Sequence, residues 1–416
     1  MITLQERVHG ASKPSDWRLD KLHQVLRVRK GYKNEGVKED NLLSLSYGRI
    51  VQKDINSSDG LLPENFEGYQ IVEPGNIVLR LTDLQNDKRS LRQGLVTQRG
   101  IITSAYDAVE VQRDNDPRFW FYSLFALDLA KHYYSLGGGV RQSIKFSDFP
   151  NDWVYRPDLP AQHSIANFLD RETARIDLLI EKKKRLVNLV SPRFEALIAE
   201  ARETGVWQRF GFSAIATQRP IPSNCAESFT PLGLYNRGRG FFKKVETDFD
   251  DLGDSSFFFV ENGDLVFSGQ FAWEGAVGLI SQEEDGCIVS HRYPVYVGKG
   301  GVLSEYLFAY FRSHHGRFLM DNCSRGAAGR NRPLNTRILE KEKIPIPPLQ
   351  LQQNIREIVV FERQLKAKIM PSIDRLREYR SALITAAVTG QINVAEWGKV
   401  GTNERQLDAI QAEMEH

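Results

Sequence analysis

Two long stretches of the chain carry apolar residues at helical spacing, with charged residues between them. The apolar positions are Ile165, Leu169, Ile176, Leu179 and Leu186 in the first stretch, and Ile355, Leu365, Ile369, Leu376 and Leu383 in the second. This spacing places the side chains on one face of an α-helix. The pattern therefore predicts long helices over residues 159–205 and 349–390.

An apolar seam on an isolated helix needs a partner. We expect the two helices to form an antiparallel, coiled-coil-like spacer; the alternative is that each packs only on its own domain. About 40 residues at about 1.5 Å each give a rod of roughly 60 Å. Pro192 and Pro371 fall inside the helical periods. Because proline removes a helical hydrogen bond, we expect a break or a new helical segment at each.

The stretches before each long helix have a different pattern. Residues 1–158 and 206–348 contain short runs of β-branched and aromatic residues bounded by Gly, Asn, Asp and Pro, for example GNIVLRL and SSFFFV. This pattern is typical of β-strands joined by turns. One helix is expected in each stretch, over residues 118–136 and 304–319.

The chain also repeats itself with an offset of roughly 190 residues. LPAQHSIANFL (159–169) aligns with LQLQQNIREIV (349–359), which pairs Gln162 with Gln352. EPGNIVLR (73–80) matches ENGDLVFS (261–268), and QGLV (93–96) matches VGLI (277–280). We therefore predict an α+β chain with two β-rich domains in tandem pseudo-repeat. The expected parts are residues 1–158, 159–205, 206–348, 349–390 and a tail over 391–416.

Composition places few limits on function. Lys and Arg number 55 and Asp and Glu 53, a net charge of +2, so any basic surface must arise locally. Cys225, Cys287 and Cys323 are far apart and suit neither a disulfide framework nor a CxxC metal pair. No run resembles a signal peptide or a membrane span, so we expect a cytoplasmic protein.

Motifs for catalysis are missing from the sequence. VGKGGV (297–302) lacks the spacing of a phosphate-binding loop, and GGGVRQ (137–142) lacks the flanking strand and helix of a dinucleotide site. The Asn/Asp-Pro-Pro-aromatic motif of amino-methyltransferases does not occur. His314 and His315 fit a partly exposed pair better than a metal site. We expect no active site, no metal and no cofactor in this chain.

Basic residues gather in loops of both β-rich stretches. The candidate DNA-binding residues are Arg80, Lys88, Arg89, Arg92, Arg99, Arg141, Arg237, Arg239, Lys243, Lys244, Arg325, Arg330 and Arg332, and Lys145 lies in the same loop as Arg141. Arginine can bind guanine with two hydrogen bonds, and lysine and arginine both bind phosphates. Solvated surface loops are the alternative reading, but comparable loops in both repeats favour DNA.

These motifs resemble the specificity subunit of type I restriction-modification systems. NLLSLSYGRI and GYQIVEPGNIVLRLTDLQNDKRSLRQGLVTQRGIITSAY resemble its first target-recognition domain, and RPDLPAQHSIANFLDRETARIDLLIEKKKRLV resembles its central helical region. KIPIPPLQLQQNIREI and REYRSALITAAVTGQI resemble the distal helical region. The resemblance extends over nearly the whole chain.

The resemblance implies a non-catalytic DNA-recognition subunit. Each target-recognition domain would read one half of an asymmetric bipartite sequence in the major groove, and the helices would set the unread spacing. Half-sites about one turn apart, roughly 34–36 Å, fit a rod of this length. The helices would also dock two modification subunits, which bind S-adenosylmethionine and methylate adenine. Restriction subunits with ATP and magnesium would complete the complex.

Two other functions compete with this interpretation. A coiled-coil scaffold could carry two β-rich domains that bind proteins or carbohydrates. A divergent single-chain DNA methyltransferase would need an S-adenosylmethionine pocket, for which the sequence offers no motif. The salt dependence of binding distinguishes such a scaffold from a DNA-binding protein, because the affinity of phosphate contacts falls steeply as ionic strength rises.

Overall fold

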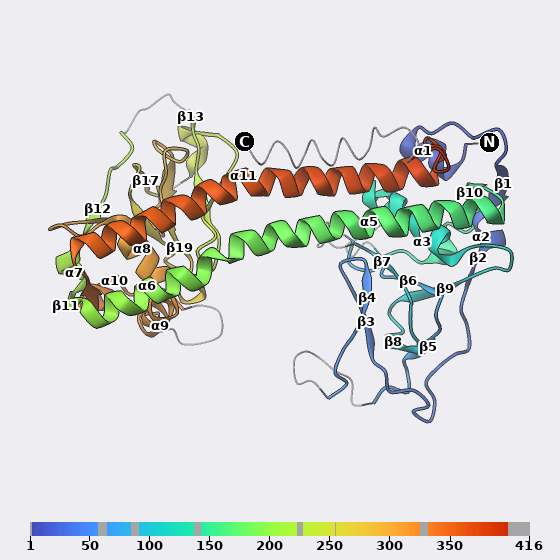
Figure 1. The fold of residues 1–416 in the computed structure, drawn as a ribbon, viewed down its shortest axis with the longest axis horizontal. Coiled ribbons are helices and arrows are strands. Elements are labelled where there is room, and N and C mark those ends of the chain that lie inside the picture. Colours follow the sequence, from blue (N-terminus) through green and yellow to red (C-terminus); the bar gives the residue numbers. More distant parts are fainter. Residues whose placement is uncertain are drawn as a thin grey trace. The chain divides into compact units, whose positions relative to one another are not determined.

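The computed structural model describes residues 2–56, 65–84, 91–136, 143–222, 228–253, 255–324 and 332–397. The chain divides into two compact units (Figure 1). Unit 1 comprises Met1–Lys182 and Met370–His416, and unit 2 comprises Lys183–Ile369. Arg325, Arg330, Lys88, Arg89 and Arg141, all candidate DNA-binding residues, lie outside the described residues.

Unit 1 is built around a four-stranded antiparallel sheet with the strand order β2-β9-β6-β7. The strands of the unit are β1 (Arg18–Lys21), β2 (Leu26–Val28), β3 (Leu43–Ser46), β4 (Arg49–Gln52), β5 (Gln70–Val72), β6 (Ile77–Leu79), β7 (Gln93–Leu95), β8 (Gly100–Ile102), β9 (Asp107–Val111) and β10 (Trp153–Arg156). Its short helices are α1 (Leu4–His9), α2 (Leu22–Val25), α3 (Pro117–Leu129), α4 (His132–Leu136) and the 3-10 turn η1 (Phe146–Asp148). Three two-stranded pairs, β1-β10, β3-β4 and β5-β8, complete the unit.

Unit 2 has a four-stranded sheet with the order β12-β21-β18-β19. Its strands are β11 (Val206–Arg209), β12 (Ala214–Thr217), β13 (Ser228–Phe229), β14 (Leu232–Leu234), β15 (Phe241–Lys243), β16 (Thr247–Asp248), β17 (Phe257–Phe259), β18 (Leu265–Phe267), β19 (Val277–Leu279), β20 (Ile288–Ser290), β21 (Val295–Gly298) and β22 (Lys343–Ile346). Its short helices are α7 (Phe210–Ser213), α8 (Ser304–Arg312), α9 (His314–Asn322), α10 (Thr336–Leu339) and the 3-10 turns η2 (Phe249–Leu252) and η3 (Ala272–Glu274). The pairs β11-β22, β14-β15 and β17-β20 repeat the three pairs of unit 1 in the same chain order.

The two long helical stretches follow these folds. The first consists of α5 (Leu159–Asn188) and α6 (Val190–Thr204), and the second is α11 (Leu349–Val388). The predicted break near Pro192 is confirmed, because α6 begins two residues before it and proline is tolerated in a first helical turn. The break expected at Pro371 is wrong, since α11 continues through it.

Segments of the long helices pack together inside each unit. In unit 1, Asp177 of α5 forms an ion pair with Arg380 of α11 at 3.1 Å, and Phe168 contacts Trp397 beyond the end of α11. Since the earlier residue of α5 contacts the later residue of the other stretch, the two helices run antiparallel. In unit 2, Phe194 and Ile198 of α6 share a hydrophobic core with α11 residues, among them Ile355.

The predicted seam residues are mostly inside these contacts. Ile165, Leu169, Ile176, Ile355, Ile369, Leu376 and Leu383 are buried, and Leu179 and Leu365 are half-buried. Leu186 is 48% exposed, so its assignment to the seam is wrong. It lies in the last turn of α5, just before the helix breaks at Leu189. The α+β class, the repeated β-rich fold and the paired long helices are confirmed.

Candidate nucleic-acid interface

The β14-β15 hairpin of unit 2 carries four of the predicted basic residues. Arg237 and Arg239 lie in its turn, and Lys243 and Lys244 lie at the end of β15 and just after it. All four side chains are exposed. None of the four forms an ion pair with another described residue, so their charges are available to an external anion.

Two aromatic rings stand beside these cations. Tyr235 and Phe242 are both partly exposed, and their ring centroids are 4.8 Å apart. The guanidinium of Arg239 lies 5.2 Å from the centroid of Tyr235, and its Nε donates to the carbonyl of Asn236 at 3.0 Å. An exposed aromatic group with an adjacent arginine suits the sugars and phosphates of a nucleic acid.

The hairpin turn is fixed to the body of unit 2. The amide of Arg237 donates to the carbonyl of Glu274 at 3.1 Å, and the amide of Gly238 donates to that of Gly275 at 2.8 Å. The side chains of Asn236 and Glu274 also form a hydrogen bond. Arg237 has a φ of 60°, a left-handed conformation that non-glycine residues seldom adopt. A turn anchored in this way presents its arginines on a defined surface.

Arg332 is only partly available. Its guanidinium forms an ion pair with Asp321 at 2.6 Å and lies 5.1 Å from the centroid of the Trp273 ring. Its Nε donates to the carbonyl of Ser324 at 3.2 Å. These contacts hold the side chain in place and leave it about a third exposed.

The predicted residues of unit 1 fall into different environments. Arg80 follows β6, is half-buried, and forms no ion pair with another described residue. Arg99 is exposed but pairs with Glu39 at 3.0 Å and with Glu73 at 2.6 Å. A phosphate would have to compete with two carboxylates for Arg99, whereas no described carboxylate pairs with Arg80.

Arg92 is an internal residue, so its assignment to the DNA surface is wrong. The side chain is buried, and it donates to the carbonyls of Thr82 and Asp83 and to the hydroxyl of Tyr134. Its backbone amide donates to the buried carboxylate of Asp128 at 2.5 Å. Burial raises the pKa of Asp128 to about 6. Arg92 therefore supports the chain around Thr82 from inside the unit.

The hairpin of unit 1 that corresponds to β14-β15 is not among the elements predicted from the sequence to bind DNA. Its turn between β3 and β4 contains Tyr47, which is 78% exposed with a φ of 45°, and β4 begins with the exposed Arg49. Arg49 forms an ion pair with Asp177 of α5 at 2.8 Å. Aligning SLSYGR (44–49) with GLYNRGR (233–239) could have identified this turn.

Both hairpins lie over the last strand of a four-stranded sheet. β4 contacts β7, and Gly94 of β7 lies against Leu45 and Ile50 of the hairpin. Gly278 of β19 lies in the same way against Leu234 and Phe241. The aligned segments QGLV and VGLI thus place a glycine beneath the hairpin in each repeat.

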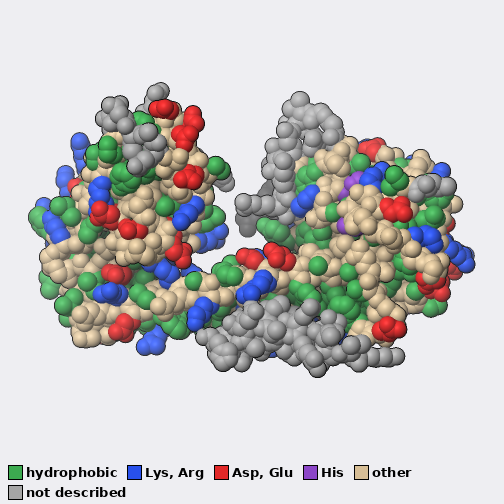
Figure 2. All heavy atoms as spheres, turned by 90° about the horizontal axis from the view of Figure 1, so that it is seen from above, with side chains coloured by type: hydrophobic (Ala, Val, Ile, Leu, Met, Phe, Trp, Pro, Cys, Tyr) green, Lys and Arg blue, Asp and Glu red, His purple; other side chains and the backbone are tan. Residues whose placement is uncertain are grey.

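The face of the molecule shown in Figure 2 has no single dominant charge among its described residues. Figure 2 shows Lys and Arg side chains interspersed with Asp and Glu on the visible face of both units. Among the described residues, no group of three or more His, Cys, Asp or Glu side chains is arranged to hold a metal ion. No helix in the described part of the chain is long and apolar enough to cross a membrane.

Comparisons with known proteins give one domain match and a set of similar solved structures. A family model for the type I restriction modification DNA specificity domain matches residues 234–369, which include the unit 2 hairpin turn and the first half of α11. No curated protein matches the chain.

Solved structures match over almost the full length. A chain from "Structural basis underlying complex assembly and conformational transition of the type I R-M system" is 14% identical, with a TM-score of 0.52, over 92% of this chain and 100% of that one. The S subunit of a type I system from M. genitalium is 12% identical over 91% and 96%, with a TM-score of 0.48. The HsdS subunit from Thermoanaerobacter tengcongensis is 15% identical over 92% and 99%, with a TM-score of 0.39.

The first of these structures has the same fold along the chain, and the family match falls on one of the two repeats. Residues 234–369 thus match the type I restriction modification DNA specificity domain, and the chain as a whole shares the fold of a chain from a type I R-M structure.

Proposed function

We propose that each β-rich domain reads one half of an asymmetric bipartite DNA sequence. The first domain comprises residues 1–158 and the second comprises residues 206–348, with long helices over 159–205 and 349–390 and a tail over 391–416. The helices set the number of unread base pairs between the half-sites. They also dock two modification subunits, to which restriction subunits are added, and the complex acts on DNA in the cytoplasm.

The repeated topology carries this proposal. The sheets β2-β9-β6-β7 and β12-β21-β18-β19 have the same order, and a hairpin with an exposed tyrosine and arginine lies over the last strand of each. Two copies of one DNA-binding fold with different surface residues suit a target made of two different half-sites.

The proposed DNA contacts are cations of these surfaces, all of them exposed except the half-buried Arg80. In unit 2 they are Arg237, Arg239, Lys243 and Lys244, and in unit 1 they are Arg80 and Arg49. Arginine in a hairpin turn can donate two hydrogen bonds to the O6 and N7 atoms of guanine, which gives sequence information. Lysines on a strand edge suit phosphates, which fix the position of the domain on the duplex.

A domain exchange tests the proposal. Residues 1–158 are replaced by the first domain of another specificity subunit, and the chimera is produced with its modification subunits. Mapping of methylated adenines in the host genome is expected to show one new half-site, one unchanged half-site and the original spacing. Loss of both half-sites in a folded, assembled complex would contradict the division of labour between the domains.

A further inference from the structure

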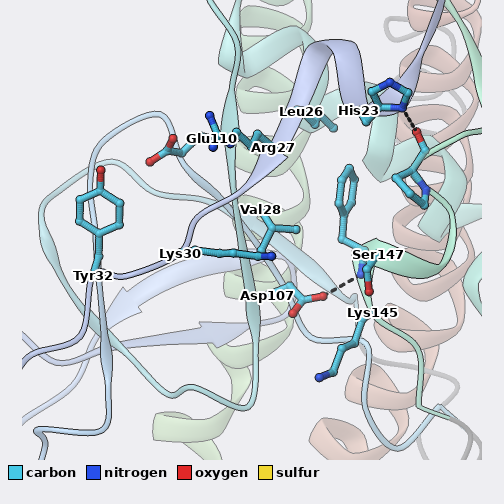
Figure 3. A pocket seen from close by; sticks show the side chains of 12 residues that line it. His23, Leu26, Arg27, Val28, Lys30, Tyr32, Asp107, Glu110, Lys145 and Ser147 are labelled. Atoms are coloured by element: carbon cyan, nitrogen blue, oxygen red, sulfur yellow. Dashed lines mark hydrogen bonds between the residues drawn. The ribbon is translucent and has the colours of Figure 1, made fainter.

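Unit 1 contains a cleft of about 680 Å³ beside the first strand of its four-stranded sheet (Figure 3). Its lining comes from α2, β2 and the segment that follows, from β9, and from the segment around η1. Leu26, Val28, Phe146 and Pro150 form its apolar part. The cleft is thus a groove between one edge of the sheet and the chain that leads into β10.

Three cations border this cleft. Arg27 and Lys30 come from β2 and the residues after it, and Lys145 directly precedes η1 (Figure 3). All three side chains are exposed. None of them forms an ion pair with another residue in the part of the chain that the structure describes.

The two carboxylates in the lining are already bound. Asp107 accepts a hydrogen bond from the amide of Phe146 at 2.7 Å, and Glu110 pairs with Arg29 at 2.7 Å. The guanidinium of Arg29 also stacks on Tyr32, 3.7 Å from the ring centroid. Three cations against the one remaining carboxylate charge, that of Asp107, leave the described lining of the cleft with an excess of positive charge.

Unit 2 has a cleft at the corresponding place, with a volume of about 240 Å³. Strand pairing gives the correspondence between the two clefts. In unit 1, Val28 pairs with Val109, which pairs with Ile77. In unit 2, Ala216 pairs with Tyr296, which pairs with Leu265, the residue aligned with Ile77 in the sequence repeat. In this register, Ile215 replaces Arg27 and Gln218 replaces Lys30. No lysine or arginine is among the described residues that line the unit 2 cleft.

We propose that the unit 1 cleft holds phosphates of the DNA backbone, and that the unit 2 cleft does not. This inference rests on the proposed function, in which the two units contact different half-sites. Lysine and arginine neutralise phosphates, and the apolar wall of the cleft can face deoxyribose. The contact fixes the position of unit 1 on its half-site without reading bases.

The difference between the repeats favours DNA over a partner protein. Two identical modification subunits that dock on a duplicated scaffold require similar chemistry at both equivalent surfaces. Two different half-sites of DNA make no such demand. A cleft with basic residues in unit 1, and with no lysine or arginine among the described lining residues in unit 2, therefore fits a contact with DNA better than a contact with a modification subunit.

Salt dependence tests this contact. In one variant, Arg27→Gln, Lys30→Gln and Lys145→Gln are combined and the chain is assembled with its modification subunits. The affinity for a duplex that contains the methylated target is measured by fluorescence anisotropy at a series of salt concentrations. Each lost phosphate contact is expected to reduce the slope of log K against log salt by about 0.9, up to about 2.7 for three contacts. The methylated sequence should remain the same.

A charge-conserving variant is the matched control. Arg27→Lys, Lys30→Arg and Lys145→Arg keep the three charges and should keep the salt slope. An unchanged slope in the glutamine variant would overturn the proposal. The proposal would also be overturned if the glutamine variant assembled less tightly with the modification subunits while its salt slope stayed unchanged. That result would assign the cleft to a partner protein. Failure of the unaltered complex to bind a bipartite target would instead refute the proposed function.

Discussion

Gln162 and Gln352 occupy matched positions in the first turns of α5 and α11 and form the same two hydrogen bonds. The Nε2 group of each donates to a proline carbonyl five residues earlier, Pro157 or Pro347, at 2.9 Å. The Oε1 atom of Gln162 accepts from the backbone amide of Asp116, the N-cap residue of α3. The Oε1 atom of Gln352 accepts from the amide of Leu303, the N-cap residue of α8, and both distances are 2.9 Å. Each glutamine thus ties a long helix to its own β-rich fold.

This bonding predicts a large effect for Gln352→Ala. The side chain is 2% exposed, and its loss would remove the hydrogen bonds of a partly buried amide and a buried carbonyl. We expect the free energy of unfolding of the chain to fall by about 1–3 kcal/mol, measured by urea denaturation. The neighbouring Gln353 is exposed, so Gln353→Ala should change the free energy of unfolding by less than about 0.5 kcal/mol. Equal losses in both variants would rule out this role.

Arg92 and Arg99 show what the sequence could not distinguish at this scale. Both lie in one basic loop of the sequence, yet Arg92 is buried and Arg99 is exposed and paired with two glutamates. Residue type and spacing predict a basic surface, but the burial of a guanidinium depends on carbonyls and hydroxyls that the fold brings near. Tyr134, which binds Arg92, is 42 residues away in the chain.

Among the elements, the contact between hairpin and sheet depends on glycine. A Cβ atom at Gly94 would lie 2.8 Å from Cδ1 of Leu45 and 2.9 Å from Cδ1 of Ile50. At Gly278 it would lie 2.5 Å from Cζ of Phe241. A glycine in a strand often marks a close approach of this kind. The repeat of QGLV and VGLI in the sequence is therefore a repeat of a packing constraint.

Gly94→Ala is expected to destabilise unit 1 by about 1–3 kcal/mol, because overpacking forces the hairpin away from the sheet. Thermal unfolding of the variant and of Gly68→Ala gives the comparison. Gly68 has no atom within 4 Å of a Cβ built on it and no positive φ, so its substitution should be nearly neutral. If both variants unfolded at the same temperature as the unaltered chain, Gly94 would have no special role beneath the hairpin.

The two prolines in the long helices have different effects because they occupy different positions: the helix breaks near Pro192 but continues through Pro371. Pro192 lies in the first turn of α6, where amides have no partner within the helix, and Pro371 lies deep inside α11. The sequence alone gives each proline the same helix-breaking tendency. At Pro371, burial of neighbouring residues such as Ser372 and Ile373 outweighs it, and this packing is a property of the folded unit.

For the whole molecule, the sequence was sufficient to predict two copies of one fold and their connection by long helices. Matched residues such as Gln162 and Gln352 carried that prediction, because a duplication leaves its offset in the sequence. The strand orders and the two clefts could not be predicted, since pairing partners such as Leu26 and Val111 are remote in sequence and share no local signal. Of the proposed DNA contacts, Arg80 and the four basic residues of the unit 2 hairpin were predicted, whereas Arg49 was missed because NLLSLSYGRI contains a single basic residue.

The proposed spacer role predicts the effect of lengthening both helices. Insertion of seven residues of helix-forming, heptad-matched sequence after Lys182 and after Ile369 adds about 10 Å to each helix. The unread gap between half-sites should grow by about three base pairs at about 3.4 Å each. Genome-wide mapping of methylated adenines measures the gap and both half-sites. A change in the bases of either half-site would contradict the spacer role.

The matched glutamine bonds have a consequence for how such genes change. The partners that the two glutamines have in common on the domain side are backbone groups, namely the carbonyls of Pro157 and Pro347 and the amides of Asp116 and Leu303. A recombination event with endpoints at these junctions can join a β-rich domain to either long helix with the same bonds intact. Under the proposed function, such an exchange would supply a new DNA target and keep these shared bonds.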